Sequence, residues 1–168
     1  MTLSFRGLNA VGAGLCLFSL LFAWLFLELA LGLEPCPLCI FDRYVIGVAA
    51  VLFGIGALFN PARMWVRRLH AGVTSLVLLG GVAIGVRHVW LQQLPPEDVP
   101  ACGPSLDYMF DVFPFFEALS MIFQGSGSCA EVDAHFLGVT LAQWTLVLFV
   151  VLLLMPLWLL VRPRGHGG

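Results

Sequence analysis

The cysteines are the residues of this chain whose type and spacing are best suited to chemistry. There are five, and two of them, Cys36 and Cys39, form a CxxC motif. A disulfide across so short a loop stabilises a fold little, whereas this spacing is the usual one for thiol–disulfide exchange. The motif opens an apolar segment expected to be helical, and a helix N-terminus favours a thiolate over a thiol. We therefore expect Cys36 and Cys39 to be redox-active.

Arg43 follows Cys39 by four residues, a spacing that places a guanidinium and a sulfur on one face of a helix. A permanent charge slightly inside an apolar segment is costly unless it has a partner or a function. One interpretation is a salt bridge with Asp42, or a side chain that reaches back to the polar interface. The functional interpretation, which we favour, is that Arg43 stabilises the Cys39 thiolate and donates hydrogen bonds to a carbonyl of a bound, membrane-soluble oxidant.

His88 lies beside Arg87 near the end of the third long apolar segment, at the depth expected for the CxxC motif. It is either a histidine satisfied by interfacial groups or a residue that borders the same pocket as Cys39, which makes His88 a candidate for oxidant binding. Glu28 and Cys16, both in the first apolar segment, are expected to be packed or locally paired and have no predicted role.

The elements that must position these residues are membrane-spanning helices. Hydrophobic residues make up 60% of the chain and charged residues 11%, a composition too apolar for a soluble domain. A span needs about 20 mostly apolar residues, and four segments qualify: 10–33, 40–59, 71–94 and 141–161. The short connection between the second and third makes them an antiparallel hairpin. We predict an all-α membrane protein, a single domain over 1–168 that forms an up-down bundle of four transmembrane helices.

The first segment has an alternative interpretation as a cleaved signal peptide, because Arg6 precedes its apolar run. That run is longer than the roughly 7–15 residues of a signal-peptide core, and no clear small-x-small cleavage site follows it. We therefore expect an uncleaved span.

The distribution of arginine predicts the orientation. The chain has no lysine, and six of its eight arginines lie in the N-terminal tail, between spans two and three, and in the C-terminal tail. These are Arg6, Arg63, Arg67, Arg68, Arg162 and Arg164. By the positive-inside rule the three segments face the cytoplasm. Both termini are then cytoplasmic, and the loops at about 34–39 and 95–140 lie on the other side. Four cysteines share that outer side: Cys36, Cys39, Cys102 and Cys129.

The long outer loop is not uniformly polar. Between positions 106 and 123 it carries many large apolar residues with acidic residues among them. This pattern predicts a short interfacial helix, broken near Pro114; a small folded cap over the bundle is the alternative. The Gly-Ser run at 125–128 predicts a flexible approach to Cys129.

Two disulfides could form from the four outer cysteines, because the outer side of a bacterial-type envelope supports them. In one interpretation both bonds are purely structural and only hold the loops in place. A metal site is a further alternative for the CxxC motif, but no second CxxC or histidine pair on that side completes a zinc site. Redox chemistry is therefore the favoured interpretation.

Two stretches make the pattern specific: CPLCIFDR at 36–43 and GSGSCAEVDAHFLGVTLAQW at 125–144. With the second cysteine pair and the four spans, they make the chain resemble the disulfide bond formation protein B (DsbB) family over essentially its whole length. The resemblance implies a multi-pass protein-dithiol:quinone oxidoreductase of the bacterial inner membrane with periplasmic cysteines. Departures are small: Pro37 and Asp42 stand at variable positions, whereas Pro104, soon after Cys102, bears on which partner docks.

The resemblance also implies a route for electrons. Cys102 would form a mixed disulfide with a DsbA-like periplasmic thiol oxidase, whose reduced CxxC attacks the Cys102–Cys129 bond. Cys129 would then pair transiently with Cys36, which releases Cys39 as a thiolate beside Arg43. Cys39 would form a charge-transfer complex with ubiquinone or menaquinone from the membrane quinone pool and reduce it to the quinol.

Two other function classes stay open. One is a non-enzymatic membrane protein whose two disulfides are structural. The other is a quinone or epoxide reductase of the vitamin K epoxide reductase type, which also uses a CxxC in a four-helix membrane bundle; the CxxC at the start of the second span disfavours it. The expected partners are thus the thiol oxidase, the quinone and the lipid bilayer, with no nucleic acid.

Overall fold

The structure of the chain is a computed structural model. The structure describes residues 4–32, 35–59, 61–95, 98, 111–114, 116–117, 120, 130, 135–136 and 138–161. Cys102, Cys129, Arg162 and Arg164 lie outside the described residues, as does most of the expected interfacial helix.

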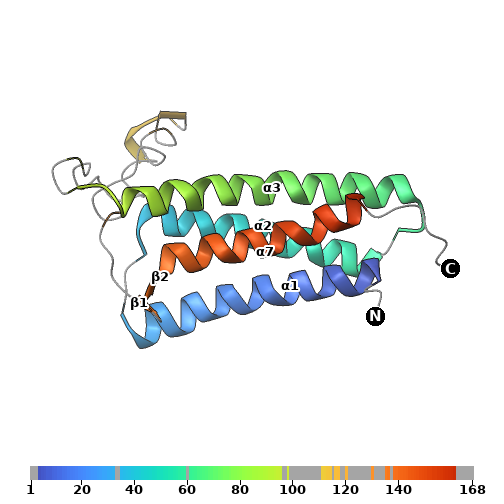
Figure 1. The fold of residues 1–168 in the computed structure, drawn as a ribbon, viewed down its shortest axis with the longest axis horizontal. Helices are drawn as coiled ribbons and strands as arrows, with labels where there is room; N and C mark the ends of the chain where they lie inside the picture. Colours follow the sequence, from blue (N-terminus) through green and yellow to red (C-terminus); the bar gives the residue numbers. More distant parts are fainter. Residues whose placement is uncertain are drawn as a thin grey trace.

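Four long helices dominate the described residues (Figure 1). The first is α1 (Phe5–Leu21), which continues as the π-helix η1 (Phe22–Ala30); then follow α2 (Pro37–Phe59), α3 (Met64–Leu91) and α7 (Leu141–Val161). Two short strands, β1 (His135–Phe136) and β2 (Val139–Thr140), pair antiparallel just before α7. All four helices are long and apolar enough to cross a membrane. The predicted all-α fold with four spans is confirmed.

The ends of the helices follow from local sequence. Ser4 caps α1, where its hydroxyl oxygen accepts a hydrogen bond of 3.1 Å from the amide of Gly7, as expected of an N-cap serine. Gly32 follows η1 with φ of 66°, a left-handed backbone that glycine adopts without strain. Pro37 is the first residue of α2, the position at which a missing N–H costs no helical bond.

The helices run past the predicted membrane segments at one end. α1 begins at Phe5 and α3 at Met64, several residues before the apolar stretches from which the spans were predicted. The added turns carry polar side chains, including Arg67 and His70 of α3. A helix continues as long as its backbone bonds are made, so its bounds need not coincide with the hydrocarbon boundary.

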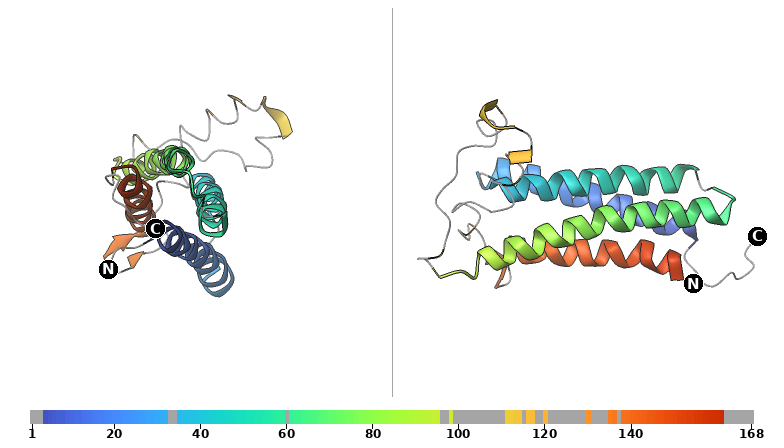
Figure 2. Two further views of the ribbon diagram at one scale, coloured as in Figure 1. Left: turned by 90° about the vertical axis from the view of Figure 1, so that its right-hand side faces the viewer. Right: turned by 90° about the horizontal axis from the view of Figure 1, so that it is seen from above.

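The helices are arranged as an antiparallel bundle in which neighbours in sequence pack side by side (Figures 1 and 2). α1 packs mainly on α2, α2 on α3, and α3 on α7. The start of α1, the α2–α3 connection and the end of α7 lie at one end of the bundle, called here the turn end. The start of α2, the end of α3 and the start of α7 lie at the other, the CxxC end.

The middle of the bundle is a close-packed apolar core. Its buried members come from all four helices: Cys16, Ile46, Ala49, Phe53, Leu78, Phe149 and Leu152. Small residues let the large rings fit: a Cβ on Gly12 would lie 2.8 Å from the ring of Phe53, and one on Gly81 would overlap the ring of Phe149. Glycine is therefore required at Gly12 and Gly81 by close helix approach.

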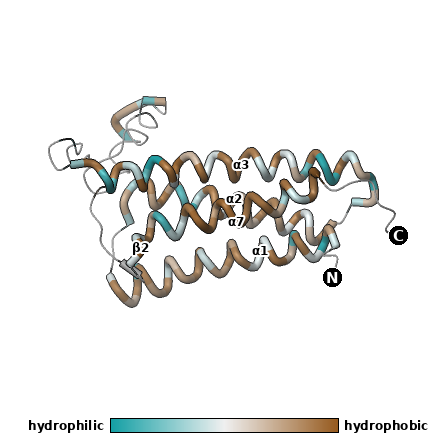
Figure 3. The backbone as a smooth tube through the Cα atoms, viewed as in Figure 1, coloured by the Kyte–Doolittle hydropathy of each residue, from teal (hydrophilic) through white to brown (hydrophobic). Residues whose placement is uncertain are grey.

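Apolar residues dominate the helices of the bundle along most of their length (Figure 3). Each helix exposes large apolar side chains, for example Phe18, Leu58, Leu76 and Trp158, which are 64% to 76% exposed. Such a surface is unfavourable in water and suited to lipid, in which helices satisfy their own backbone hydrogen bonds. The chain is a multi-pass membrane protein.

Candidate functional site

The CxxC motif lies at the start of α2. The two sulfurs are 3.0 Å apart, and the backbone N–H of Cys39 donates a hydrogen bond of 3.3 Å to the sulfur of Cys36. Cys36 is buried, with 7% of its surface exposed, and Cys39 is half-buried. Amides at a helix start stabilise negative charge on such a sulfur. The two side chains are thus placed to form a disulfide or to hold a thiolate.

His88 reaches the motif from the far end of α3. Its Nε2 lies 3.7 Å from the sulfur of Cys36, and only 4% of its surface is exposed. Its other ring nitrogen, Nδ1, lies 3.7 Å from Oδ2 of Asp42, which is also buried. A distance of 3.7 Å is too long for a hydrogen bond, so the Asp42 carboxylate acts on the ring through its negative charge. That charge favours the tautomer with the proton on Nδ1. In that tautomer the lone pair of Nε2 faces Cys36.

Arg43 forms an ion pair with Glu28, through Nη1 of the arginine and Oε1 of the glutamate. The two side chains are 26% and 25% exposed. The salt bridge considered from the sequence, between Arg43 and Asp42, is therefore replaced by one that joins α2 to η1. Glu28, expected to be packed or locally paired, is the counter-ion of the arginine beside the CxxC motif.

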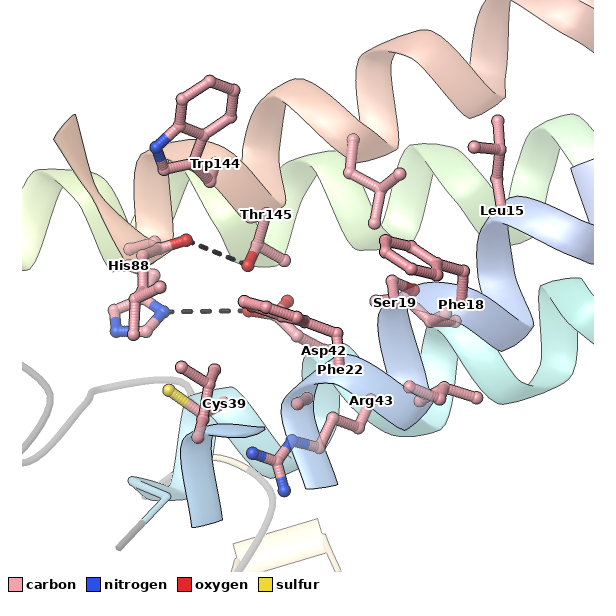
Figure 4. Close-up of a pocket in the computed structure, with 17 residues that line it drawn as sticks. Leu15, Phe18, Ser19, Phe22, Cys39, Asp42, Arg43, His88, Trp144 and Thr145 are labelled. Atoms are coloured by element: carbon pink, nitrogen blue, oxygen red, sulfur yellow. Dashed lines mark hydrogen bonds and ion pairs between the residues drawn. The ribbon is translucent and has the colours of Figure 1, made fainter. Parts of the chain in front are cut away.

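A cavity of about 380 Å³ opens beside these residues (Figure 4). Its polar end is formed by Cys39, Asp42, Arg43 and His88. The remaining wall is largely apolar and comes from α1, η1, α2 and α7: Leu15, Phe18, Ser19, Leu20, Phe22, Ala23, Leu27, Ile46, Leu141, Ala142, Trp144, Thr145 and Leu148. An apolar pocket with a few polar groups gathered at one place is the usual form of a small-molecule site.

The start of α7 is held against α3 by a small hydrogen-bond network. Thr140 and Gln143 form a capping box: the amide of Gln143 donates to the Thr140 hydroxyl at 3.3 Å, and the amide of Thr140 donates to Oε1 of Gln143 at 3.1 Å. The Thr140 hydroxyl also donates to Oε1 of Gln92 at 2.8 Å, just beyond α3. The network fixes the turn of α7 that brings Trp144 and Thr145 to the cavity.

The structure brings together four of the six residues that the sequence singled out. Cys36, Cys39, Arg43 and His88 meet at the CxxC end. The other two, Cys102 and Cys129, lie outside the described residues. Cys16, which had no predicted role, is a residue of α1 and is fully buried in the apolar core that the four helices share.

Sequence reasoning assigned no role in the site to Asp42 or Glu28. A signal for Asp42 was available, because it follows Cys39 by three residues and so lies on the same helix face. For Glu28 no comparable signal exists: its side chain leaves a π-helix, whose turn holds more residues than that of an α-helix, so the α-helical period does not give its direction.

Comparisons with known proteins agree with this picture. Residues 5–159 match the family described as disulfide bond formation protein DsbB. A disulfide bond formation protein B from Chromohalobacter salexigens is 50% identical over 151 residues, which is 86% of this chain and 88% of that protein. One from Nitrosococcus oceani is 44% identical over 168 residues, 100% of this chain and 98% of that protein.

A third relative, from Saccharophagus degradans, is 46% identical over 140 residues and covers 83% of each chain. The similarity thus includes the four helices, the CxxC end and the cavity. The chain belongs to the DsbB family of disulfide bond formation proteins.

Proposed function

We propose that this protein passes electrons from a reduced periplasmic dithiol protein, through two cysteine pairs, to a quinone of the bacterial inner membrane. Family membership implies a disulfide-generating oxidoreductase. The observation that supports a quinone as the electron acceptor is the cavity. Cys39, Arg43 and His88 lie together at its polar end, and the rest of its wall consists largely of apolar residues from the long helices. A quinone, whose ring bears carbonyls and whose tail is apolar, has the matching chemistry.

The residues of the cavity fit ubiquinone or menaquinone. A volume of about 380 Å³ is large enough for a quinone head group, since small-molecule pockets start at about 300 Å³. Arg43 would donate hydrogen bonds to a carbonyl, and aromatic side chains such as Phe18 and Trp144 would contact the ring or the first isoprene unit. The quinone supplies the oxidising power of the reaction: it accepts two electrons and two protons and leaves as the quinol.

The two sulfurs of the motif supply those electrons. When the Cys36–Cys39 dithiol becomes a disulfide, one S–S bond forms, two S–H bonds are lost, and two electrons and two protons leave the cysteines. The guanidinium of Arg43, which lines the same cavity as Cys39, would stabilise Cys39 as a thiolate, the reactive form. Cys39 lines the cavity, so it is the sulfur from which electrons leave.

His88 and Asp42 handle the proton of the other sulfur. With its Nδ1 proton held toward Asp42, His88 has Nε2 available to accept the thiol proton of Cys36 at 3.7 Å. The imidazolium formed is stabilised by the buried Asp42 carboxylate. His88 also lines the cavity, so the proton it takes up would be held where a bound quinone could receive it.

The route upstream of Cys36 uses Cys102 and Cys129. A DsbA-like thiol oxidase attacks the Cys102–Cys129 disulfide through a mixed disulfide with Cys102, and Cys129 transfers the oxidising equivalent to the CxxC motif by exchange with Cys36. This route requires both cysteine pairs on one side of the membrane. The arginine distribution supports that orientation, with both termini in the cytoplasm and the cysteines in the periplasm.

The test is turnover of the purified protein in detergent. A reduced thioredoxin-fold dithiol protein and ubiquinone are supplied, and quinone reduction is followed by absorbance. Wild type is expected to reduce quinone, Cys39→Ser to be inactive, and Cys16→Ser, which changes a core cysteine that does not line the cavity, to match wild type. Equal rates for wild type and Cys39→Ser would refute the proposal.

A second variant tests the upstream route. Cys102→Ser is expected to abolish oxidation of the dithiol protein while the chain still binds quinone, measured by retention of ubiquinone through gel filtration. Partner oxidation at the wild-type rate in Cys102→Ser would rule out the proposed entry point for electrons.

A further inference from the structure

We propose that the reduced CxxC motif and His88 form a binding site for a thiophilic metal ion such as Zn²⁺. The sequence argued against a metal because no second CxxC or histidine pair accompanies the motif. The fold supplies the missing ligand from α3. The sulfurs of Cys36 and Cys39 and a ring nitrogen of His88 all lie within 4.8 Å of one another, which is the three-ligand set of an open zinc site.

The distance between the Cys36 sulfur and His88 is close to that of a tetrahedral zinc site, and the distance between the two sulfurs is short of it. With Zn–S and Zn–N bonds of about 2.3 and 2.0 Å, neighbouring ligand atoms lie roughly 3.5–3.8 Å apart. The Cys36 sulfur is 3.7 Å from Nε2 of His88, and the two sulfurs are 3.0 Å apart. The sulfurs therefore need to separate by less than about 1 Å, which small rotations of the cysteine side chains provide.

Asp42 is an independent indication that His88 is oriented as a ligand. Its Oδ2 lies 3.7 Å from Nδ1 of His88, on the ring nitrogen that does not face Cys36. Metal-binding histidines usually donate their other ring N–H to a carboxylate, a backbone carbonyl or water, which turns the remaining nitrogen toward the metal. Asp42 lies on the side of the ring where such an acceptor is needed. The same arrangement serves proton transfer when no metal is bound.

The charges of the ligand set balance. Two thiolates neutralise a divalent cation, and the charge of Arg43, which borders the site, is matched by that of Glu28. The Asp42 carboxylate is a further negative charge, and it lies against the ring of His88 on the side away from Cys36. Because Cys36 and His88 are 7% and 4% exposed, an unbalanced charge there would be costly. Binding converts two thiols and one neutral imidazole into two thiolates and an imidazole bound to Zn²⁺, and it releases two protons.

Binding at this site depends on redox state, because a Cys36–Cys39 disulfide offers no thiolate. A bound ion is coordinated by both sulfurs, and it lies at the polar end of the cavity that Cys39 and His88 line. It therefore holds the motif in the reduced form and blocks reoxidation. Metal binding itself does not depend on the proposed function. The expectation that a bound ion blocks quinone reduction does depend on the proposed function.

The experiment uses a full-length chain with Cys102→Ser and Cys129→Ser, so that the outer cysteine pair contributes no ligand. Quinone-free protein is reduced, freed of reductant, and dialysed against buffered Zn²⁺; Cd²⁺ is titrated in parallel because its bonds to sulfur absorb in the ultraviolet. One ion per chain is expected for the reduced protein and none after oxidation of the motif.

Matched variants locate the site. Cys39→Ser and His88→Ala are expected to weaken binding at least tenfold, and Asp42→Asn by about tenfold to a hundredfold, as loss of an orienting partner does in zinc sites. His70→Ala, a histidine at the turn end, and Cys16→Ser should bind as tightly as the parent. Helical circular dichroism and gel filtration establish that each variant is folded, and Asp42→Asn keeps the test decisive if His88→Ala does not fold.

Equal Zn²⁺ binding by the oxidised and reduced protein would overturn the proposal, as would unchanged affinity in Cys39→Ser together with either His88→Ala or Asp42→Asn. Turnover measured without metal separates this outcome from failure of the proposed function. A chain that binds Zn²⁺ but reduces no quinone retains the metal site and loses the quinone proposal; a chain that reduces quinone but binds no Zn²⁺ does the reverse.

Discussion

Replacing Glu28 by glutamine tests the ion pair that the structure places beside the CxxC motif. The substitution keeps the size of the side chain and removes its charge, which leaves Arg43 without a counter-ion near the apolar boundary. Exposed ion pairs contribute about 0.2–1 kcal/mol, and loss of one partner of a buried pair costs about 3–5 kcal/mol. Since the two side chains are 26% and 25% exposed, we expect an intermediate loss of about 1–2 kcal/mol.

A double-mutant cycle measures the pair itself. Unfolding of wild type, Glu28→Gln, Arg43→Gln and the double variant is followed by circular dichroism in detergent with increasing sodium dodecyl sulfate. The coupling free energy is expected to be about 1–2 kcal/mol. Glu117→Gln, an exposed glutamate outside the Arg43–Glu28 ion pair, serves as the control and should show no coupling to Arg43. A coupling below about 0.3 kcal/mol between Glu28 and Arg43, the usual scatter for independent sites, would refute the reasoning.

Three further predictions concern packing, capping and proton transfer. Gly81→Ala should destabilise the bundle by about 1–3 kcal/mol because its Cβ would overlap a core ring. Gly80→Ala, whose Cβ would meet nothing within 4 Å, should not lower the unfolding midpoint, since alanine is the better helix former; an equal loss in the two variants would contradict this. Thr140→Val should cost about 1 kcal/mol by removing the cap of α7, measured by the same unfolding titration; a wild-type midpoint would contradict it. His88→Gln should lower quinone turnover about a hundredfold if it accepts the Cys36 proton; a wild-type kcat would exclude that role.

Much of the architecture was predictable because a membrane simplifies the physics. Lipid requires each spanning segment to satisfy its own backbone bonds, so long apolar runs are helices and their number is given by hydropathy. The spacing of Cys39 and Arg43 on one helix face follows from the helical period. Placing His88 near them required only that α3 return to the end at which α2 begins, which the short connection between the helices ensures.

The partners of the charged side chains were not predictable in the same way. Arg43 could pair with a sequence neighbour or with any carboxylate on an adjacent helix, and the choice of Glu28 over Asp42 depends on how η1 and α2 are rotated against each other. Rotation is set by packing details such as Gly12 against Phe53, which no periodicity encodes. The same holds for His88: its depth was predictable, but its contact with Cys36 at 3.7 Å was not.

The most direct test of the central claim is a single turnover by the CxxC motif alone. The Cys102→Ser and Cys129→Ser chain is reduced, freed of reductant and mixed with one equivalent of ubiquinone. Quinol is then measured by absorbance, and the Cys36–Cys39 disulfide by loss of alkylation in mass spectrometry. One quinol and one disulfide per chain are expected, and neither in the Cys39→Ser version. Quinone left unreduced by the folded, reduced motif, or quinol formed without the disulfide, would contradict transfer of electrons from this motif to the occupant of the cavity.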